Sequence, residues 1–108
     1  MELTIRKEEK AVIVSVTGRM DALAAPQFDK ELETLLEGGE TRIIIDFKDL
    51  EYISSAGLQI ILAAAKKMEE VKGEIILLHL KDAVKEVFEI SGFDTLFRIF
   101  EDQDAALA

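Results

Sequence analysis

Two adjacent serines, Ser54 and Ser55, stand directly before an alanine, a glycine and a long apolar segment that begins at Leu58. This order predicts a loop that turns into a helix at the serines. The first turn of a helix presents backbone N–H groups without intrahelical partners and the positive end of the helix dipole, so it stabilises a negative group placed there. A serine at this point is suited to carry a phosphate, and its modification could act as a switch.

A structural role for one of the serines is also compatible with this pattern. Serine is a frequent N-cap, whose side-chain oxygen accepts a backbone N–H of the first helical turn. Neither serine is followed three residues later by Glu or Gln, since those positions hold Gly57 and Leu58. The capping-box pattern therefore does not say which serine caps. Gly57 permits a close approach of the backbone, either to the sheet or to a partner.

Asp46 is a further side chain that could carry chemistry. It follows three consecutive isoleucines at the predicted carboxyl end of a strand, a position that would suit the phosphoacceptor of a response-regulator receiver. The rest of the receiver pattern is missing, because the first strand ends in Arg6 and Lys7 instead of an acidic pair, and two strands precede any helix. Asp46 is therefore expected to support the loop that presents Ser54 and Ser55, by accepting backbone N–H bonds.

Enzymatic activity is not expected. A serine hydrolase needs a base within hydrogen-bond reach of its nucleophile, and the one histidine, His79, lies near the end of a predicted strand. No Gly-x-Ser-x-Gly motif surrounds either serine. The chain has no cysteine, and its carboxylates are scattered along predicted helix faces, so the sequence offers no metal site and implies no cofactor.

Length and charge limit the classes of partner. The 108 residues suit one domain over residues 1–108. The chain has 22 acidic against 13 basic residues, and its net charge of −9 disfavours nucleic acids and anionic membranes as partners and favours a basic protein surface. No apolar run approaches the roughly 20 residues of a membrane span, and the first residues lack the apolar run of a signal peptide, so a cytoplasmic location is expected.

The hydrophobic pattern predicts the order ββαβαβα followed by a short βα. Strands are expected over residues 3–6, 11–17, 42–47, 74–80 and 97–100. Helices are expected between Pro26 and Gly38, from about Ala56 to Val71 and from Asp82 to Ser91, with a frayed terminal helix over 102–108. The stretch 48–53 is expected to be a loop. Alternating strands and helices require right-handed crossovers between parallel strands, while the opening hairpin adds an antiparallel strand. The predicted fold is α/β, a mixed sheet with packed helices.

Three local features of this arrangement can be checked. The isoleucines at positions 43–45 form an unbroken apolar run, typical of a central strand covered on both faces. Asp21 and Asp82 are expected to cap helical turns. The inward face of the third helix is expected to consist of Ala83, Val84, Val87 and Phe88.

Three segments together resemble the STAS domain, a family that includes the bacterial anti-sigma factor antagonists. They are Gly18 to Asp21 at the end of the second predicted strand, Ile43 to Phe47, and Tyr52 to Leu58. The resemblance covers essentially the whole chain in length and element order. It implies a phosphorylation-switched binding module whose unphosphorylated form binds an anti-sigma factor and so releases a sigma factor. A STAS module that binds a small ligand or scaffolds a complex without serine phosphorylation is the alternative.

The same resemblance implies site residues and partners. In the family, the serine two residues before the glycine is phosphorylated by an anti-sigma factor with serine kinase activity, and a serine phosphatase restores binding. That serine is Ser55, with Ser54 as the alternative. The partner-binding surface is expected to consist of Arg19, Asp21, Ser54, Ser55, Ala56, Gly57 and Gln59. Arg19 and Asp21 belong to it because they lie at the same edge of the sheet as the serines if the strands are parallel. An exposed turn with a helix cap is the alternative for these two residues. The chain has Ser54 where many members have aspartate, Ala56 where a second serine is common, and Gln59 where a glycine often follows.

Overall fold

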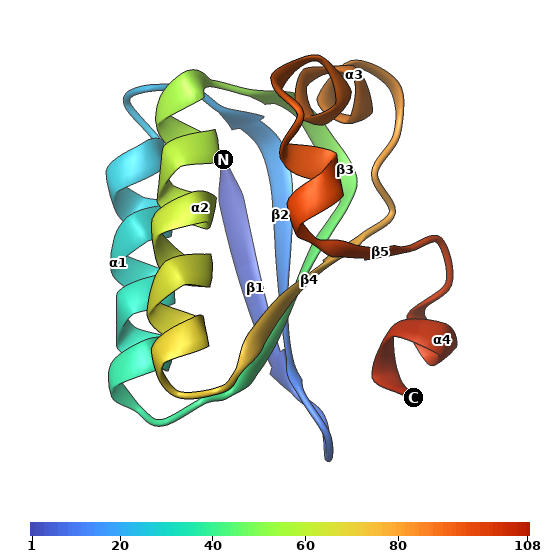
Figure 1. The fold of residues 1–108 in the computed structure, drawn as a ribbon. Helices are drawn as coiled ribbons and strands as arrows, with labels where there is room; N and C mark the ends of the chain where they lie inside the picture. Colours follow the sequence, from blue (N-terminus) through green and yellow to red (C-terminus); the bar gives the residue numbers. More distant parts are fainter.

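The computed structural model describes residues 1–108 and contains one mixed sheet of five strands (Figure 1). The strands lie in the spatial order β1 (Glu2–Lys7), β2 (Val12–Met20), β3 (Arg42–Ile53), β4 (Glu74–Leu78) and β5 (Arg98–Phe100). β1 is antiparallel to β2, and every other neighbouring pair is parallel. The predicted mixed sheet, with an opening hairpin and parallel crossovers, is confirmed.

The helices lie on both faces of this sheet, in unequal numbers. They are α1 (Ala25–Glu37), α2 (Ser55–Glu70), α3 (Asp82–Ser91) and the short α4 (Gln103–Leu107), with a 3-10 turn, η1 (Phe93–Leu96), after α3. Figure 1 shows α1 and α2 side by side on one face and α4 apart from them near the C-terminus. None of the helices combines the length and the apolar composition that a membrane span requires.

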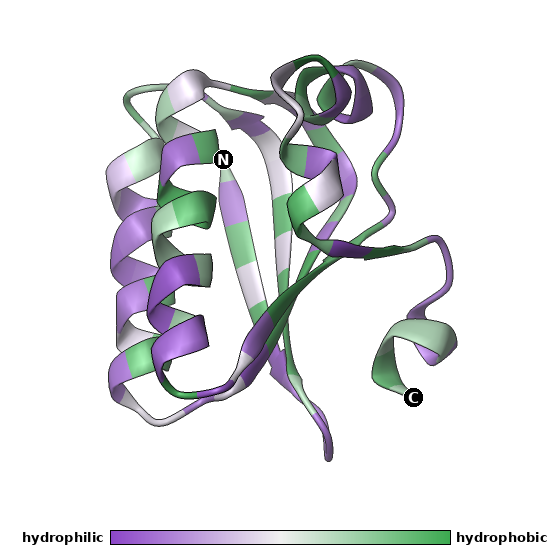
Figure 2. Ribbon diagram, viewed as in Figure 1, coloured by the Kyte–Doolittle hydropathy of each residue, from purple (hydrophilic) through white to green (hydrophobic).

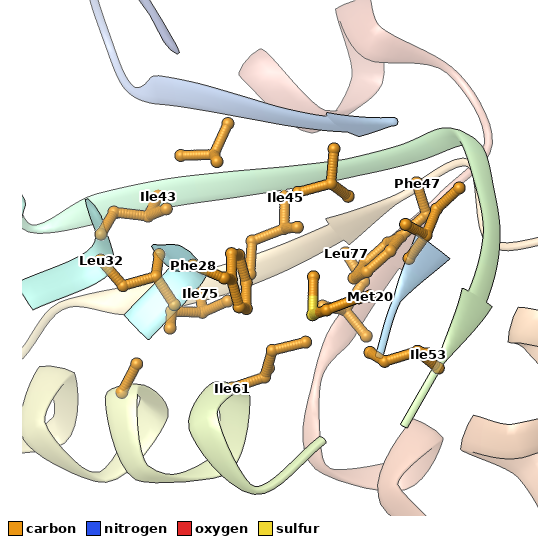
Figure 3. Packing of buried hydrophobic residues seen from close by; sticks show 14 of the residues in the cluster. Met20, Phe28, Leu32, Ile43, Ile45, Phe47, Ile53, Ile61, Ile75 and Leu77 are labelled. Atoms are coloured by element: carbon orange, nitrogen blue, oxygen red, sulfur yellow. The ribbon is translucent and has the colours of Figure 1, made fainter. Parts of the chain in front are cut away.

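The main core lies between the sheet and the helices α1, α2 and α3. Figure 3 shows Phe28 and Leu32 of α1 beside Ile43 and Ile45 of β3, with Ile61 of α2 facing the same layer. All five side chains are almost completely buried. Figure 2 shows hydrophilic and hydrophobic bands alternating along α1 and α2, as expected for helices with one buried face. This packing fixes the start of α2 against the sheet.

The second face of the sheet is covered by α4. Ile44 of β3 is fully buried there, beside Ile13, Ile76 and Ala106. The prediction that the isoleucine run forms a central strand covered on both faces is therefore confirmed. The guanidinium of Arg42 donates hydrogen bonds to the carbonyl oxygens of Ala106, at 2.9 Å, and of Leu107, at 3.3 Å. The C-terminal helix, expected to be frayed, is docked by these contacts.

The prediction of a loop over residues 48–53 is wrong, because β3 continues to Ile53. Its pairing with β2 shifts register twice, between Ser15 and Thr17 and between Gly18 and Arg19, which marks two bulges. Buried side chains on the main-core face therefore recur at Phe47, Leu50 and Ile53, at every third residue. The sequence pattern did not predict a strand here, because the side chains of an undistorted strand return to the same face at every second residue.

Two details near α3 also differ from expectation. Asp82 is the first residue of α3 and has a φ of +51°, and no side-chain hydrogen bond caps this helix. Ala83 is exposed, whereas Val84 and Phe88 are buried and Val87 is half-buried. Phe88 anchors the helix: its ring packs edge-on against the ring of Phe47, and the two ring centroids are 5.6 Å apart. Val84 and Phe88, four residues apart, define the buried stripe of α3, and Ala83 lies beside this stripe.

Candidate functional site

The candidate site lies where β2 and β3 end side by side. Met20 pairs with Ile53 in the parallel register, and the backbone N–H of Ser54 donates to the carbonyl oxygen of Met20 at 2.8 Å. The chain then turns directly into α2 at Ser55. The end of β2 and the two serines therefore meet at one edge of the sheet, as the sequence predicted for parallel strands.

Ser54 is the N-cap of α2. Its backbone is extended, with φ −84° and ψ 168°, and its Oγ accepts the backbone N–H of Gly57 at 3.2 Å. Ser54 is half-buried. The structure thus decides between the two serines, which the sequence left open: the hydroxyl of Ser54 is engaged in holding the first turn of the helix.

Ser55 is the first residue of α2, and its side chain is exposed. Its hydroxyl has no hydrogen-bond partner within the chain, in contrast to that of Ser54. Ala56 and Gln59, also assigned to the partner surface, are exposed on the same first turns. A free hydroxyl at the positive end of a helix of 16 residues is accessible to a modifying enzyme and tolerates an added negative charge.

Gly57 lies beneath this surface, because it is buried. A Cβ at this position would approach Met20 Sδ to 2.7 Å and Ile53 Cγ1 to 2.9 Å. Figure 3 shows Met20 between Ile53 and Ile61, at the point where α2 meets the sheet. Of the two uses of Gly57 considered from the sequence, close packing on the sheet is the one that the structure supports.

Arg19 and Tyr52 form a stacked pair next to the serines. They are partners in the β2–β3 register, and the guanidinium carbon of Arg19 lies 4.4 Å from the centroid of the Tyr52 ring. Tyr52 keeps 38% of its surface exposed. The pair presents a cation and an aromatic face together. Sequence reasoning missed Tyr52 as a site residue, because its pairing with Arg19 depends on the second bulge.

Asp21 shapes the turn that follows β2. Its Oδ1 accepts the backbone N–H groups of Leu23, at 3.1 Å, and of Ala24, at 2.9 Å. Its carbonyl oxygen accepts the N–H of Ala25, where α1 begins with Pro26 in its first turn. The predicted capping role of Asp21 is confirmed. The same turn leaves Leu23 with 92% of its surface exposed, which no sequence signal indicated.

The role predicted for Asp46 needs correction. Asp46 accepts the backbone N–H of Lys48 at 3.0 Å, as an aspartate in a turn does, but it lies within β3 and well before Ile53. Its other partner is His79, whose Nδ1 lies 2.8 Å from Asp46 Oδ1. Asp46 thus stabilises the first bulge of β3, not the loop that carries the serines. The position also differs from the strand end that a receiver phosphoacceptor would occupy.

His79 joins the end of β4 to the same bulge. It follows β4 with a φ of +59°, and its backbone N–H donates to the carbonyl oxygen of Phe100 at 3.0 Å. Its ring is engaged with Asp46, so the histidine serves as a polar residue at a strand end, as the sequence suggested.

Charge and shape are distributed unevenly around the molecule. Glu33 of α1 raises the pKa of Lys67 above its ordinary value, through a side-chain hydrogen bond of 2.6 Å and through its charge. This pair lies about 18 Å along α2 from Ser55.

Two surface depressions of about 550 and 470 Å³ lie elsewhere on the molecule. The first is lined by residues that include Lys48 and Asp49, and the second by residues that include Lys10 and Lys72. Neither of these two depressions is lined by the serines.

Comparison with known proteins gives a consistent result. The family model of the STAS domain matches residues 2–106. A curated relative, described as a candidate anti-sigma factor antagonist and named BtrV, from Bordetella bronchiseptica, is 41% identical over 108 residues, which cover 100% of this chain and 93% of that protein.

Two solved structures show the same fold at low identity. An anti-sigma factor antagonist from Mycobacterium paratuberculosis has a TM-score of 0.90 at 22% identity, over 98% of this chain and 90% of that one. The Bacillus cell fate determinant SpoIIAA in its phosphorylated form has a TM-score of 0.76 at 24% identity, over 96% of each chain.

Proposed function

Because the chain belongs to the STAS domain family, we propose that it is an anti-sigma factor antagonist, a binding protein rather than an enzyme. Its unphosphorylated form would bind an anti-sigma factor and so release the sigma factor that the anti-sigma factor holds. The relative that is 41% identical carries the same description and is matched over almost its whole length, which supports this role. Ser55, Ala56 and Gln59 are exposed together on the first turns of α2, and such a surface favours a protein partner over a small ligand.

Phosphorylation of Ser55 is the proposed switch. The anti-sigma factor, acting as a serine kinase, transfers the γ-phosphoryl group of ATP to Ser55 Oγ, the hydroxyl proton is lost and ADP leaves. A serine phosphatase then hydrolyses the phosphoester. One observation carries the choice of residue: the hydroxyl of Ser55 is exposed and free, whereas that of Ser54 caps the helix. The solved phosphorylated form of SpoIIAA supports the idea that this fold can carry a phosphate.

The effect of the phosphate is expected on binding rather than on folding. It adds about −1.5 to −2 charges at the start of α2, where the helix dipole and free N–H groups stabilise it. A partner surface that packs against the neutral hydroxyl cannot keep this packing around a dianion. Desolvation and repulsion then weaken the complex by roughly a hundredfold or more.

The direct test is phosphorylation in vitro. The chain is incubated with ATP and the purified kinase-type anti-sigma factor of its source organism, and the modified residue is located by fragment mass spectrometry. Ser55→Ala is expected to abolish phosphate uptake, while the matched variant Ser54→Ala retains it. Phosphate found on Ser54 alone would shift the site by one residue. Tight binding without any phosphorylation would instead favour a scaffolding STAS module.

A further inference from the structure

We propose that Leu23 is an apolar anchor of the partner surface, which inserts into an apolar pocket of the anti-sigma factor when that protein docks over Ser55. This inference rests on the function proposed above and deepens it, because it names a residue that sets affinity without taking part in phosphoryl transfer. It starts from an unusual exposure: Leu23 leaves 92% of its surface in contact with solvent.

Position distinguishes Leu23 from the other exposed apolar side chains. Single exposed hydrophobic residues are common on protein surfaces and need no explanation by themselves. In this chain, most of them lie on other elements, at Ile5, Val71, Ile90, Leu96 and Ile99. Leu23 and the half-exposed Tyr52 are instead the two that flank the edge of the sheet where the serines lie.

The backbone places the Leu23 turn beside the Ser55 turn. Asp21 directly follows Met20, and the carbonyl oxygen of Met20 accepts the N–H of Ser54 at 2.8 Å. The two turns therefore leave the sheet from neighbouring hydrogen-bonded residues. Figure 1 shows the connection from β2 to α1 next to the start of α2, at the same end of the molecule. A partner that covers Ser55 also reaches Leu23.

The turn orders the backbone at Leu23. Asp21 Oδ1 accepts the N–H of Leu23 itself and that of Ala24, and α1 begins immediately afterwards. Because the backbone is already ordered, binding at this position costs little conformational entropy. Next to it, the stacked Arg19 and Tyr52 supply the two residue types that often dominate binding energy at interfaces. Together, these residues form an apolar and aromatic rim with one cation.

The test compares affinities of single variants for the purified kinase-type anti-sigma factor of the source organism, measured by titration calorimetry. Leu23→Ser is expected to weaken binding by roughly tenfold to a hundredfold, as expected when a fully buried leucine is lost from an interface. Leu23→Met, which keeps an apolar side chain of similar volume, is expected to bind within about threefold of the unaltered chain.

Val71→Ser is the matched control. Val71 is also an exposed aliphatic residue, 57% accessible, but it lies at the opposite end of α2 from Ser55. This variant is expected to bind with unchanged affinity. Equal affinity of Leu23→Ser and the unaltered chain, or an equal loss in Val71→Ser, would overturn the anchor alone. Failure of the unaltered chain to bind the anti-sigma factor would overturn the proposed function and the anchor with it.

Discussion

The carbonyl oxygen of Met20 accepts the backbone N–H of Ser54, so the last residue of β2 holds the residue that caps α2. Through this bond, the parallel pairing of β2 and β3 continues to the first turn of the helix. Ser55 follows immediately, is exposed, and its hydroxyl has no hydrogen-bond partner in the chain. Two neighbouring serines thus have separate tasks, one in the structure and one proposed in signalling.

This division predicts different effects of removing each hydroxyl. Ser54→Ala loses the bond to the N–H of Gly57 and is expected to lower the free energy of unfolding by about 1 kcal/mol. Ser55→Ala loses no bond within the chain and is expected to change it by less than about 0.5 kcal/mol. Urea unfolding of both variants measures the difference. Equal destabilisation by the two variants would show that Ser54 is not the cap.

The central position of β3 gives a second prediction. Ile44→Asp places a charge between the sheet and α4, where Ile44 is fully buried and has no polar partner. The expected cost is several kcal/mol, enough to prevent cooperative folding. Thr4→Asp is the control, because Thr4 is exposed on β1, the edge strand of the same sheet. Thermal unfolding followed by circular dichroism should show a normal transition for Thr4→Asp and none for Ile44→Asp.

The third prediction concerns the revised role of Asp46. Asp46→Ala removes the acceptor for the N–H of Lys48 and the partner of the His79 ring. We expect a loss of about 1–3 kcal/mol in unfolding free energy, since the contact between Asp46 and the His79 ring is partly shielded from water. Phosphate uptake at Ser55 should persist at temperatures where the variant is folded. Selective loss of phosphorylation in a stable Asp46→Ala protein would restore the idea that Asp46 supports the serine loop.

The sequence predicted most of the fold because its hydrophobic pattern is regular where packing is regular. The isoleucine run in β3 and the helical spacing of Phe28 and Leu32 each match one structural period. The prediction failed at residues 48–53, where two bulges bring Phe47, Leu50 and Ile53 to one face. Bulges depend on pairing with β2, which a pattern within a single segment does not contain.

The candidate site was predicted less completely than the fold. The serines, Arg19 and Asp21 were expected at one edge of the sheet, because parallel strands end together, and the structure brings them there. The choice of Ser54 as the cap and the stacking of Arg19 on Tyr52 depend on contacts across strands or on exact turn geometry. The exposure of Leu23 likewise follows from how Asp21 folds the turn, not from residue type.

The central claim is that phosphate on Ser55 switches binding and leaves the fold intact. The decisive measurement is the affinity for the purified anti-sigma factor of three forms: unphosphorylated, phosphorylated on Ser55, and Ser55→Asp, each also checked by circular dichroism and thermal melting. We predict near-native spectra and melting for all three, an affinity loss of roughly a hundredfold with phosphate, and a smaller loss with aspartate, which has less charge and fewer acceptor oxygens. Equal affinity of the phosphorylated and unphosphorylated forms would contradict the switch, and unfolding on phosphorylation would contradict the helix-terminus argument.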